Sequence, residues 1–199
     1  MTKVVGLTGG IASGKSTVSQ MLSQVGLPIV DADQVAHRLQ QPGQLGLSEL
    51  VGQFGREILT ADGHLNRRAL GKMAFSDTGV RHQLNAIMQP LIWETIMDQL
   101  AAFKKQDIPF VILDAPLLFE QGYDQECDLI VVVTVSHDRQ VQRLMSRNGY
   151  TRTVAEQRIA AQWPLAKKAR RADMVINNDG SLNELRRQVA KLVDYLGAK

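Results

Sequence analysis

Short apolar runs alternate with amphipathic segments along this chain of 199 residues. Continuous apolar runs are typical of strands covered on both faces of a sheet. An apolar run lies first at residues 3–8, continuous runs follow at 110–113 and 129–135, and further strands are expected at 27–32 and 173–177. Helical spacing follows the first run over 15–25, and Ser181 with Glu184 predicts a capping box that opens the last helix. The order strand, helix, strand, helix predicts a doubly wound α/β fold on a parallel sheet.

One interval does not fit this alternation. Residues 34–107 separate two predicted strands by far more chain than the dozen or so residues that a crossover requires. Three segments in the interval have helical patterning, and turn signals separate them, the last at Pro90. They are residues 47–54, 68–75 and 91–103. We therefore expect an inserted helical subdomain.

Composition narrows the class of protein only slightly. The chain is 44% hydrophobic and 22% charged, which is typical of globular domains. Cys127 is the single cysteine, so an internal disulfide is excluded and a cytoplasmic location is expected. No apolar run approaches the ~20 residues of a membrane helix, so we expect no membrane partner. The net charge of +3 is compatible with nucleic acid, anionic lipid or a phosphorylated small molecule.

A glycine-rich motif gives the first chemical indication. Residues 9–16 match G-x4-G-K-[ST] between the first predicted strand and the first predicted helix. Backbone N–H groups of such a loop surround phosphates, while Lys15 reaches the β- and γ-phosphates and Ser16 offers a hydroxyl to Mg²⁺. A glycine-rich turn without a ligand is the alternative. The residues expected to bind ATP are Gly10, Ile11, Ala12, Ser13, Gly14, Lys15, Ser16 and Thr17.

Asp114 ends the apolar run 110–113, at the strand end where α/β folds bind their ligands. An apolar strand followed by Asp is the Walker B pattern, and Asp114 is therefore the second expected Mg²⁺ ligand. The alternative is an Asp that caps the turn before Pro116. Asp128 stands at the start of its strand, at the opposite edge, and is expected to be structural.

The carboxylates of Asp31 and Asp33, at the end of the second predicted strand, favour a kinase among P-loop proteins. A guanine-specific switch is a competing class, but the chain lacks the N-K-x-D motif of that class. Asp33 can accept the hydrogen bond of an acceptor hydroxyl and take its proton as the new bond forms. The alternative is that Asp33 caps a helix over residues 34–39.

The segment from 139 to 171 contains nine basic residues and a single acid, Glu156. Arg139, Arg143 and Arg147 recur at every fourth position and share one helix face. The same helix is expected to bury Val141, Leu144 and Met145. So many cations with almost no anions between them require a negative partner.

A kinase supplies such a partner in the triphosphate, over which a basic helical lid would close. Arg143 is the leading candidate for the arginine that contacts the phosphates. The alternatives are a nucleic-acid surface, with Tyr150 and Trp163 as stacking residues, and a solvated helical face.

Taken together, these motifs resemble the dephospho-CoA kinase family, whose members phosphorylate the ribose 3′-hydroxyl of dephospho-coenzyme A. The match continues through further segments in the same order. They are residues 6–11, 13–16, 31–33, 42–43, 65–67, 114–120 and 176–180. The ordered set is specific, whereas the P-loop alone is generic.

The resemblance implies a P-loop NTPase-like core, a helical acceptor-binding insert at 34–107 and a basic lid at 139–172. The core would comprise residues 1–33, 108–138 and 173–199. The family pattern implies that Asp33 binds the acceptor hydroxyl, Arg143 is the lid arginine, and Asn178 and Gly180 lie near the adenine of ATP. The residues implied to line the dephospho-CoA groove are Arg67, Pro116, Leu117, Leu118 and Phe119.

Two positions depart from the family pattern. Ala12 replaces a usual glycine, and a negative φ there would make its methyl group harmless. Gln89 replaces a usual histidine before Pro90. We predict ATP- and Mg²⁺-dependent phosphorylation of dephospho-CoA, with no nucleic-acid partner. Another P-loop small-molecule or nucleotide kinase and a nucleic-acid-linked ATPase remain the alternatives.

Overall fold

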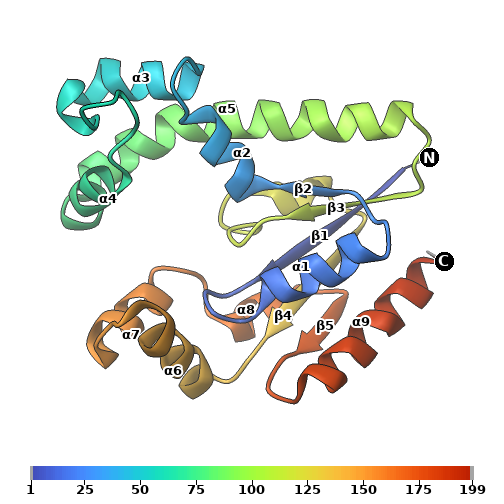
Figure 1. Cartoon of the computed structure of the whole chain (residues 1–199). Helices are drawn as coiled ribbons and strands as arrows, with labels where there is room; N and C mark the ends of the chain where they lie inside the picture. Colours follow the sequence, from blue (N-terminus) through green and yellow to red (C-terminus); the bar gives the residue numbers. More distant parts are fainter. Residues whose placement is uncertain (1, 198–199) are drawn as a thin grey trace. The chain divides into compact units, whose positions relative to one another are not determined.

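A five-stranded sheet in the order β2-β3-β1-β4-β5 forms the centre of the fold (Figure 1). The computed structural model describes residues 2–197. The strands are β1 (Lys3–Gly9), β2 (Ile29–Asp31), β3 (Phe110–Asp114), β4 (Leu129–Thr134) and β5 (Met174–Asn177). β1 pairs in parallel with β3 and β4, and β4 pairs in parallel with β5. All five predicted strands are present, although the second is shorter than residues 27–32.

The chain is divided into two compact units by the contacts between its residues. The first comprises Met1–Val30 and Phe103–Lys199, and the second comprises Asp31–Ala102. Helices of the first are α1 (Lys15–Gln24), α6 (His137–Asn148), α7 (Arg152–Ala160), α8 (Leu165–Ala169) and α9 (Leu182–Leu196), with a 3-10 turn η2 (Tyr123–Glu126). Among residues 2–197 no helix has both the length and the apolar character needed to cross a membrane.

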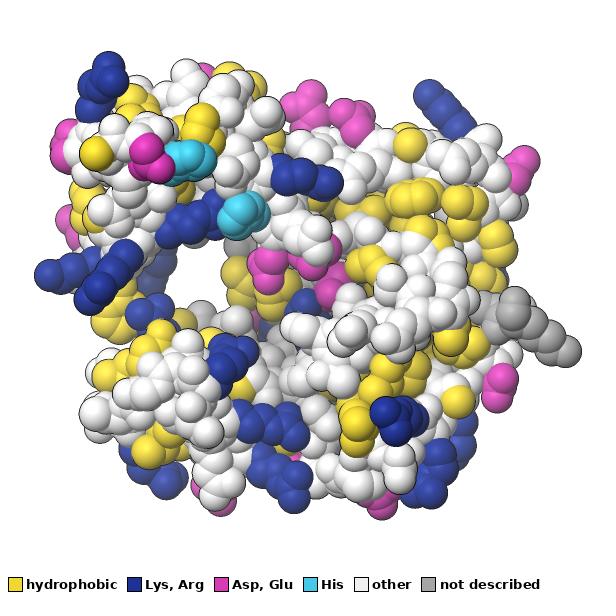
Figure 2. Space-filling view, in the orientation of Figure 1, with side chains coloured by type: hydrophobic (Ala, Val, Ile, Leu, Met, Phe, Trp, Pro, Cys, Tyr) yellow, Lys and Arg dark blue, Asp and Glu magenta, His cyan; other side chains and the backbone are white. Residues whose placement is uncertain are grey.

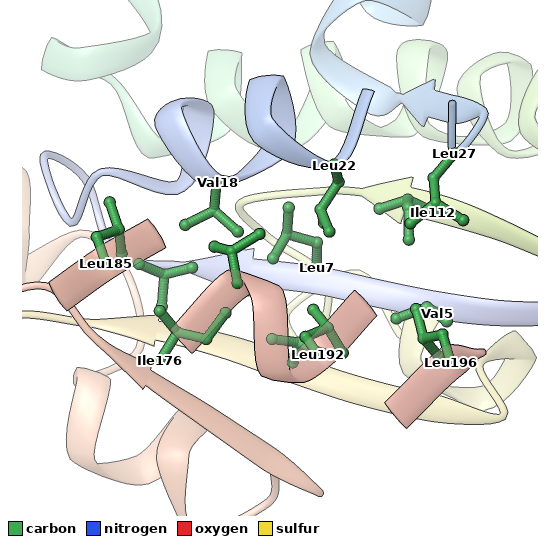
Figure 3. Packing of buried hydrophobic residues seen from close by; sticks show 13 residues of the cluster. Val5, Leu7, Val18, Leu22, Leu27, Ile112, Ile176, Leu185, Leu192 and Leu196 are labelled. Carbon is green, nitrogen blue, oxygen red and sulfur yellow. The ribbon is translucent and has the colours of Figure 1, made fainter. Parts of the chain in front are cut away.

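The main hydrophobic core lies between the sheet and the helices α1 and α9 (Figure 3). Leu7 of β1, Leu22 of α1 and Leu192 of α9 have no exposed surface. Each such side chain stabilises the fold by about 1.5–3 kcal/mol through burial. The predicted capping box is confirmed, because Ser181 and Glu184 bond each other's backbone N–H at the start of α9. This core fixes the strands whose carboxyl ends form the site described below.

The second unit is helical and is described by itself. Its elements are α2 (Ala32–Leu39), α3 (Leu45–Phe54), η1 (Arg56–Ile58), α4 (Arg67–Ser76) and α5 (Thr78–Lys105). The expectation that Pro90 separates two elements is wrong, because α5 continues through it. Its buried positions Met88, Ile92, Ile96 and Leu100 recur every fourth residue on both sides of the proline. Their packing stabilises the helix against the loss of one backbone hydrogen bond.

The alternative that Asp33 caps the helix after β2 is wrong. Asp31, not Asp33, is the N-cap of α2, and its Oδ1 accepts from the Gln34 backbone N–H at 3.0 Å. Asp33 lies inside the first turn of the helix. A carboxylate in the first turn interacts favourably with the helix dipole. Asp31 thus caps the helix, and Asp33 supplies this first-turn charge.

Candidate active site

The P-loop begins where the central strand ends. Register pairs Leu7 with Asp114 on one side of β1 and Gly9 with Val133 on the other. Residues 9–16 then connect β1 to α1, so the loop, the end of β3 and the amino end of α1 lie together. The carboxyl ends of parallel strands lie at the same edge of the sheet. The P-loop and Asp114, about a hundred residues apart in the sequence, therefore meet here.

Two residues of the loop have left-handed backbone geometry. Gly14, the N-cap of α1, has φ +94°, and a side chain at this position would collide with the Asn178 amide. Ala12 has φ +59°, so the negative φ that would have made its methyl group harmless is not present. A left-handed alanine costs about 1–2 kcal/mol, and we attribute the observed geometry to the bonds that hold its neighbours.

Lys15 at the start of α1 and Asp114 at the end of β3 form an ion pair beside this loop. The Lys15 side chain is 12% exposed and that of Asp114 is 3% exposed. Ser16, the next residue of α1, is exposed. A hydroxyl and a carboxylate oxygen are ligands that suit Mg²⁺, which retains waters and phosphate oxygens for its other positions. The donor set therefore fits the metal that the sequence implied.

Two glutamines hold the tip of the loop. Gln140 of α6 donates from Nε2 to the Ile11 carbonyl at 2.8 Å. Gln162, which follows α7, accepts from the Ile11 backbone N–H at 2.8 Å. Sequence reasoning did not identify either residue, because the P-loop motif specifies the loop and not its supports.

Arg143 contacts the next two residues of the loop. Its Nη1 donates to the carbonyls of Ala12 and Ser13 at 3.2 and 3.3 Å, and its Nη2 donates to the Asn178 carbonyl at 3.0 Å. The Asn178 side chain donates to the Ser13 carbonyl at 2.7 Å. The structure thus brings Arg143 and Asn178 to the P-loop as backbone supports, and their contacts with phosphate or adenine remain predictions.

The basic segment (residues 139–172) has acidic partners within the protein. Four of its cations pair with carboxylates. The pairs are Arg139 with Asp179, Arg152 with Asp138 and Glu156, Lys168 with Glu120, and Arg171 with Asp124. The argument that these cations require a bound anion is therefore wrong for these four, because all but one of their acidic partners lie outside the segment.

Figure 2 shows Lys and Arg side chains gathered over α6 and α7. Val141 and Leu144 are buried in α6 as expected, but Met145 is exposed, so the buried stripe is narrower than predicted. Gln140 is also buried on α6, because its amide is bound to the P-loop.

The loop after β3 carries four of the residues expected in the substrate groove. Pro116 and Leu117 are partly exposed, whereas Leu118 is fully buried and Phe119 is nearly so. Phe119 stacks on Trp163 with ring centroids 6.0 Å apart. Lys167 Nζ lies 3.3 Å from the centroid of the same Trp163 ring. Of the four side chains, only Pro116 and Leu117 therefore present appreciable surface to a ligand.

Comparison with known proteins identifies the family. A family model described as dephospho-CoA kinase matches residues 3–184. A dephospho-CoA kinase of Geobacillus kaustophilus is 45% identical over 193 residues, which cover 97% of this chain and 96% of that one. The chain belongs to the dephospho-CoA kinase family.

Solved structures agree with this assignment. A dephospho-CoA kinase from Campylobacter jejuni has a TM-score of 0.74 and 25% identity, with 98% of each chain covered. A shikimate kinase from Bacteroides thetaiotaomicron has a TM-score of 0.55 at 17% identity and 98% coverage of each chain, and this likeness shows the fold alone. The chain is thus a dephospho-CoA kinase family member with the α/β fold of P-loop kinases.

The second unit contains the other residues that the family resemblance implied. Asp33 lies in the first turn of α2, and Arg67 begins α4 after the N-cap Asn66. The Arg67 Nη2 donates to the His37 carbonyl at 3.3 Å, which orients the guanidinium within this unit. Gln89, at the position where the family usually has histidine, lies inside α5.

Several remaining expectations concern structural residues. Asp128 is structural as predicted, because its carboxylate accepts from the Val4 backbone N–H at 2.7 Å. Gly180 precedes α9, and a Cβ there would collide with the Glu184 carboxylate. Over residues 2–197, no group of three or more His, Cys, Asp or Glu side chains could hold a metal ion.

Lys168 is the functional candidate that sequence reasoning missed. It was one of nine similar cations in the sequence, yet its side chain is completely buried. Burial lowers its pKa, and the bond to Glu120 opposes that effect. Only the apolar Pro164, Leu165 and Ala166 at the start of α8 could have indicated that this helix packs inward.

Proposed function

We propose that this chain transfers the γ-phosphoryl group of ATP to the ribose 3′-hydroxyl of dephospho-CoA, giving coenzyme A and ADP. The observation that carries the proposal is the P-loop at the end of β1 with Lys15 paired to Asp114, in a chain of the dephospho-CoA kinase family. The family membership favours this acceptor over those of other P-loop kinases.

ATP would bind with its phosphates against the loop of residues 10–17, in which the N–H groups of Ile11 and Ser13 already donate to Gln162 and to the Gly10 carbonyl. Lys15 is placed to exchange its carboxylate partner for phosphate oxygens, because its side chain retains some exposure. Ser16 and Asp114 would hold Mg²⁺, which neutralises charge on the phosphates. Releasing Lys15 from Asp114 would thus free the carboxylate for the metal.

Asp33 is the proposed acceptor for the proton of the 3′-hydroxyl. Of the two carboxylates after β2, that of Asp31 is bound to the Gln34 backbone as the cap of α2. The family resemblance gives the chemical role to Asp33, which lies in the first turn of the same helix. Arg67, Pro116, Leu117, Leu118 and Phe119 are the proposed dephospho-CoA contacts, with Leu118 acting through its backbone since its side chain is buried.

The basic segment is the proposed lid, and Arg143 is its proposed phosphate-binding arginine. Asn178 and Gly180 are the proposed adenine contacts. A nucleic-acid surface is less well supported, because the Trp163 ring already contacts Phe119 and Lys167. Bases that stack on a protein need an available aromatic face.

The test is an ADP-release assay with dephospho-CoA, adenosine, AMP and shikimate as separate acceptors. We expect dephospho-CoA to be preferred by at least ~100-fold in kcat/KM, because a site that bonds the whole acceptor loses that binding energy with fragments. Equal use of the four acceptors would contradict the substrate assignment and leave a P-loop kinase of other specificity.

Asp33→Asn tests the proton acceptor within the same assay. We expect kcat to fall ~10²–10⁴-fold while the Kd for ATP stays within about twofold, since general-base catalysis contributes that range. Asp31→Asn is the matched control, because asparagine removes the same charge and still caps a helix. Equal losses in the two variants would show that the Asp33 carboxylate has no special role.

A further inference from the structure

A buried lysine joins the basic segment to the loop after β3. Lys168 Nζ lies 2.9 Å from Glu120 Oε1 and donates to the Pro116 carbonyl at 2.6 Å. The side chain of Lys168 has no exposed surface, and that of Glu120 is 14% exposed. A buried ammonium needs such partners because its desolvation is costly. Lys168 is therefore fixed to both ends of the five-residue stretch from Pro116 to Glu120.

The same stretch is anchored from the other side by the strand that leads into the P-loop. Thr8, one residue before Gly9, donates from Oγ1 to the Pro116 carbonyl at 3.2 Å. That carbonyl thus accepts from Lys168 and Thr8 together, using both of its lone pairs. Asp114 stands only two residues earlier, so the bonds of Lys168 constrain the loop directly beside the Lys15–Asp114 pair.

Helix α8 also reaches the P-loop. A Cβ at Gly10 would lie 3.1 Å from Cγ of Leu165, the first residue of α8. Gln162, three residues earlier, holds the Ile11 N–H, and the Trp163 backbone N–H donates to Glu120 Oε1 at 2.9 Å. One short stretch of the basic segment therefore contacts the phosphate loop and the loop after β3 at once.

We propose that Lys168 is a positioning residue for phosphoryl transfer: through Pro116 and Glu120 it holds residues 115–119 in the conformation that receives dephospho-CoA. This inference rests on the proposed function, because it takes residues 116–119 as part of the acceptor groove. Lys168 touches neither ATP nor the transferred group. Its effect is on the affinity for the acceptor rather than on the binding of the nucleotide.

The experiment separates positioning from stability with two variants. Lys168→Met alone leaves the charged Glu120, which is only 14% exposed, without its cation, so we expect a lower melting temperature. The double variant Lys168→Met/Glu120→Gln removes both charges and keeps an oxygen for the Trp163 N–H. Neutral replacement of a buried ion pair is often well tolerated, so we expect its melting temperature within ~3 °C of the wild type.

The readout is the KM for each substrate in the double variant. We expect the KM for dephospho-CoA to rise about tenfold, because small displacements of positioning groups have effects of this size, and the KM for ATP to stay within about twofold. Lys191→Met, which removes an exposed lysine from α9, is the control with unchanged constants.

Two results would overturn the inference. One is a double variant with wild-type KM for dephospho-CoA, which would make the pair purely structural. The other is an equal rise in both KM values, which would place the effect on the P-loop. Failure of the proposed function is distinct, because wild-type enzyme would then not prefer dephospho-CoA in the four-acceptor assay.

Discussion

The P-loop region and the α8 region each contain a lysine paired with a carboxylate, yet the two pairs differ in their surroundings. Lys15 is 12% exposed and pairs with Asp114, which is 3% exposed. Lys168 is fully buried, and its partner Glu120 is 14% exposed. In the first pair the cation reaches the surface, whereas in the second the cation is enclosed and also bonded to a backbone carbonyl.

This difference indicates what each pair can do. A partly exposed lysine at the start of a helix can exchange one anionic partner for another, as phosphate binding requires. An enclosed lysine bonded to both a carboxylate and a backbone carbonyl has no exposed surface at which it could meet another anion. The first pair is therefore suited to change during the reaction, and the second is suited to remain.

The largest expected effect comes from breaking the exchangeable pair. In Lys15→Met we expect turnover to fall at least ~10³-fold, because the positive charge that stabilises the phosphates is lost. Stability should also fall, by about 3 kcal/mol, because Asp114 is left buried without its cation. Steady-state kinetics and urea unfolding measure the two effects.

The control for this prediction is Lys15→Met/Asp114→Asn. Removing both charges should restore most of the stability and none of the turnover. In the Lys168 region the corresponding double variant should restore stability and keep substantial turnover. If both double variants behaved alike, the distinction between the two pairs would be wrong.

A smaller effect, on stability, should follow from relieving the backbone strain at Ala12 in the P-loop. Ala12 has φ +59°, a conformation that glycine adopts without cost. Ala12→Gly should therefore change the free energy of unfolding by no more than about 1 kcal/mol, in the stabilising direction, since relief of strain exceeds the added flexibility of the unfolded chain. Thermal unfolding would show a rise of about 2–4 °C.

The matched control for Ala12 is Ala160→Gly, at the end of α7 in the ordinary helical region. This change should destabilise the protein, because glycine lowers helix stability. Destabilisation by Ala12→Gly of the same size would mean that the left-handed geometry is not strained.

The smallest expected effect is the contribution of Lys168 to the pH dependence of stability. Burial lowers the pKa of Lys168 below its ordinary value of 10.5, and the Glu120 bond only partly offsets this. The unfolded chain then holds more protons than the folded one in the window below 10.5, so this group makes stability rise with pH there. Urea unfolding at pH 8 and pH 10 measures the trend.

Comparison with Lys168→Met/Glu120→Gln isolates the contribution of this group. Cys127 and Tyr123 have pKa values raised by burial to about 12, so their contributions decrease at alkaline pH in both proteins and cancel. The wild type should gain stability relative to the variant between pH 8 and pH 10. A constant difference would show that the Lys168 ammonium is not destabilised by burial.

The sequence by itself determined the sheet strands, the place of the P-loop after the first strand, and the position of Asp114 at the end of β3. Each of these depends on local order: apolar runs of strand length, or a glycine pattern in which neighbouring backbone groups bind one ligand. The ordered motifs also predicted the family, which the comparisons confirmed. Pro90 was misread because a local breaker was outweighed by packing on both sides of it.

Only the tertiary structure decided which of the nine cations in the basic segment have internal partners. Glu120 lies 48 positions before Lys168, and Ile11 lies well over a hundred positions before Gln140 and Gln162. Ala12 is held in its unexpected conformation by the same kind of contact. Charge and hydrogen bonding depend on distance in space, which a residue's neighbours in sequence do not specify.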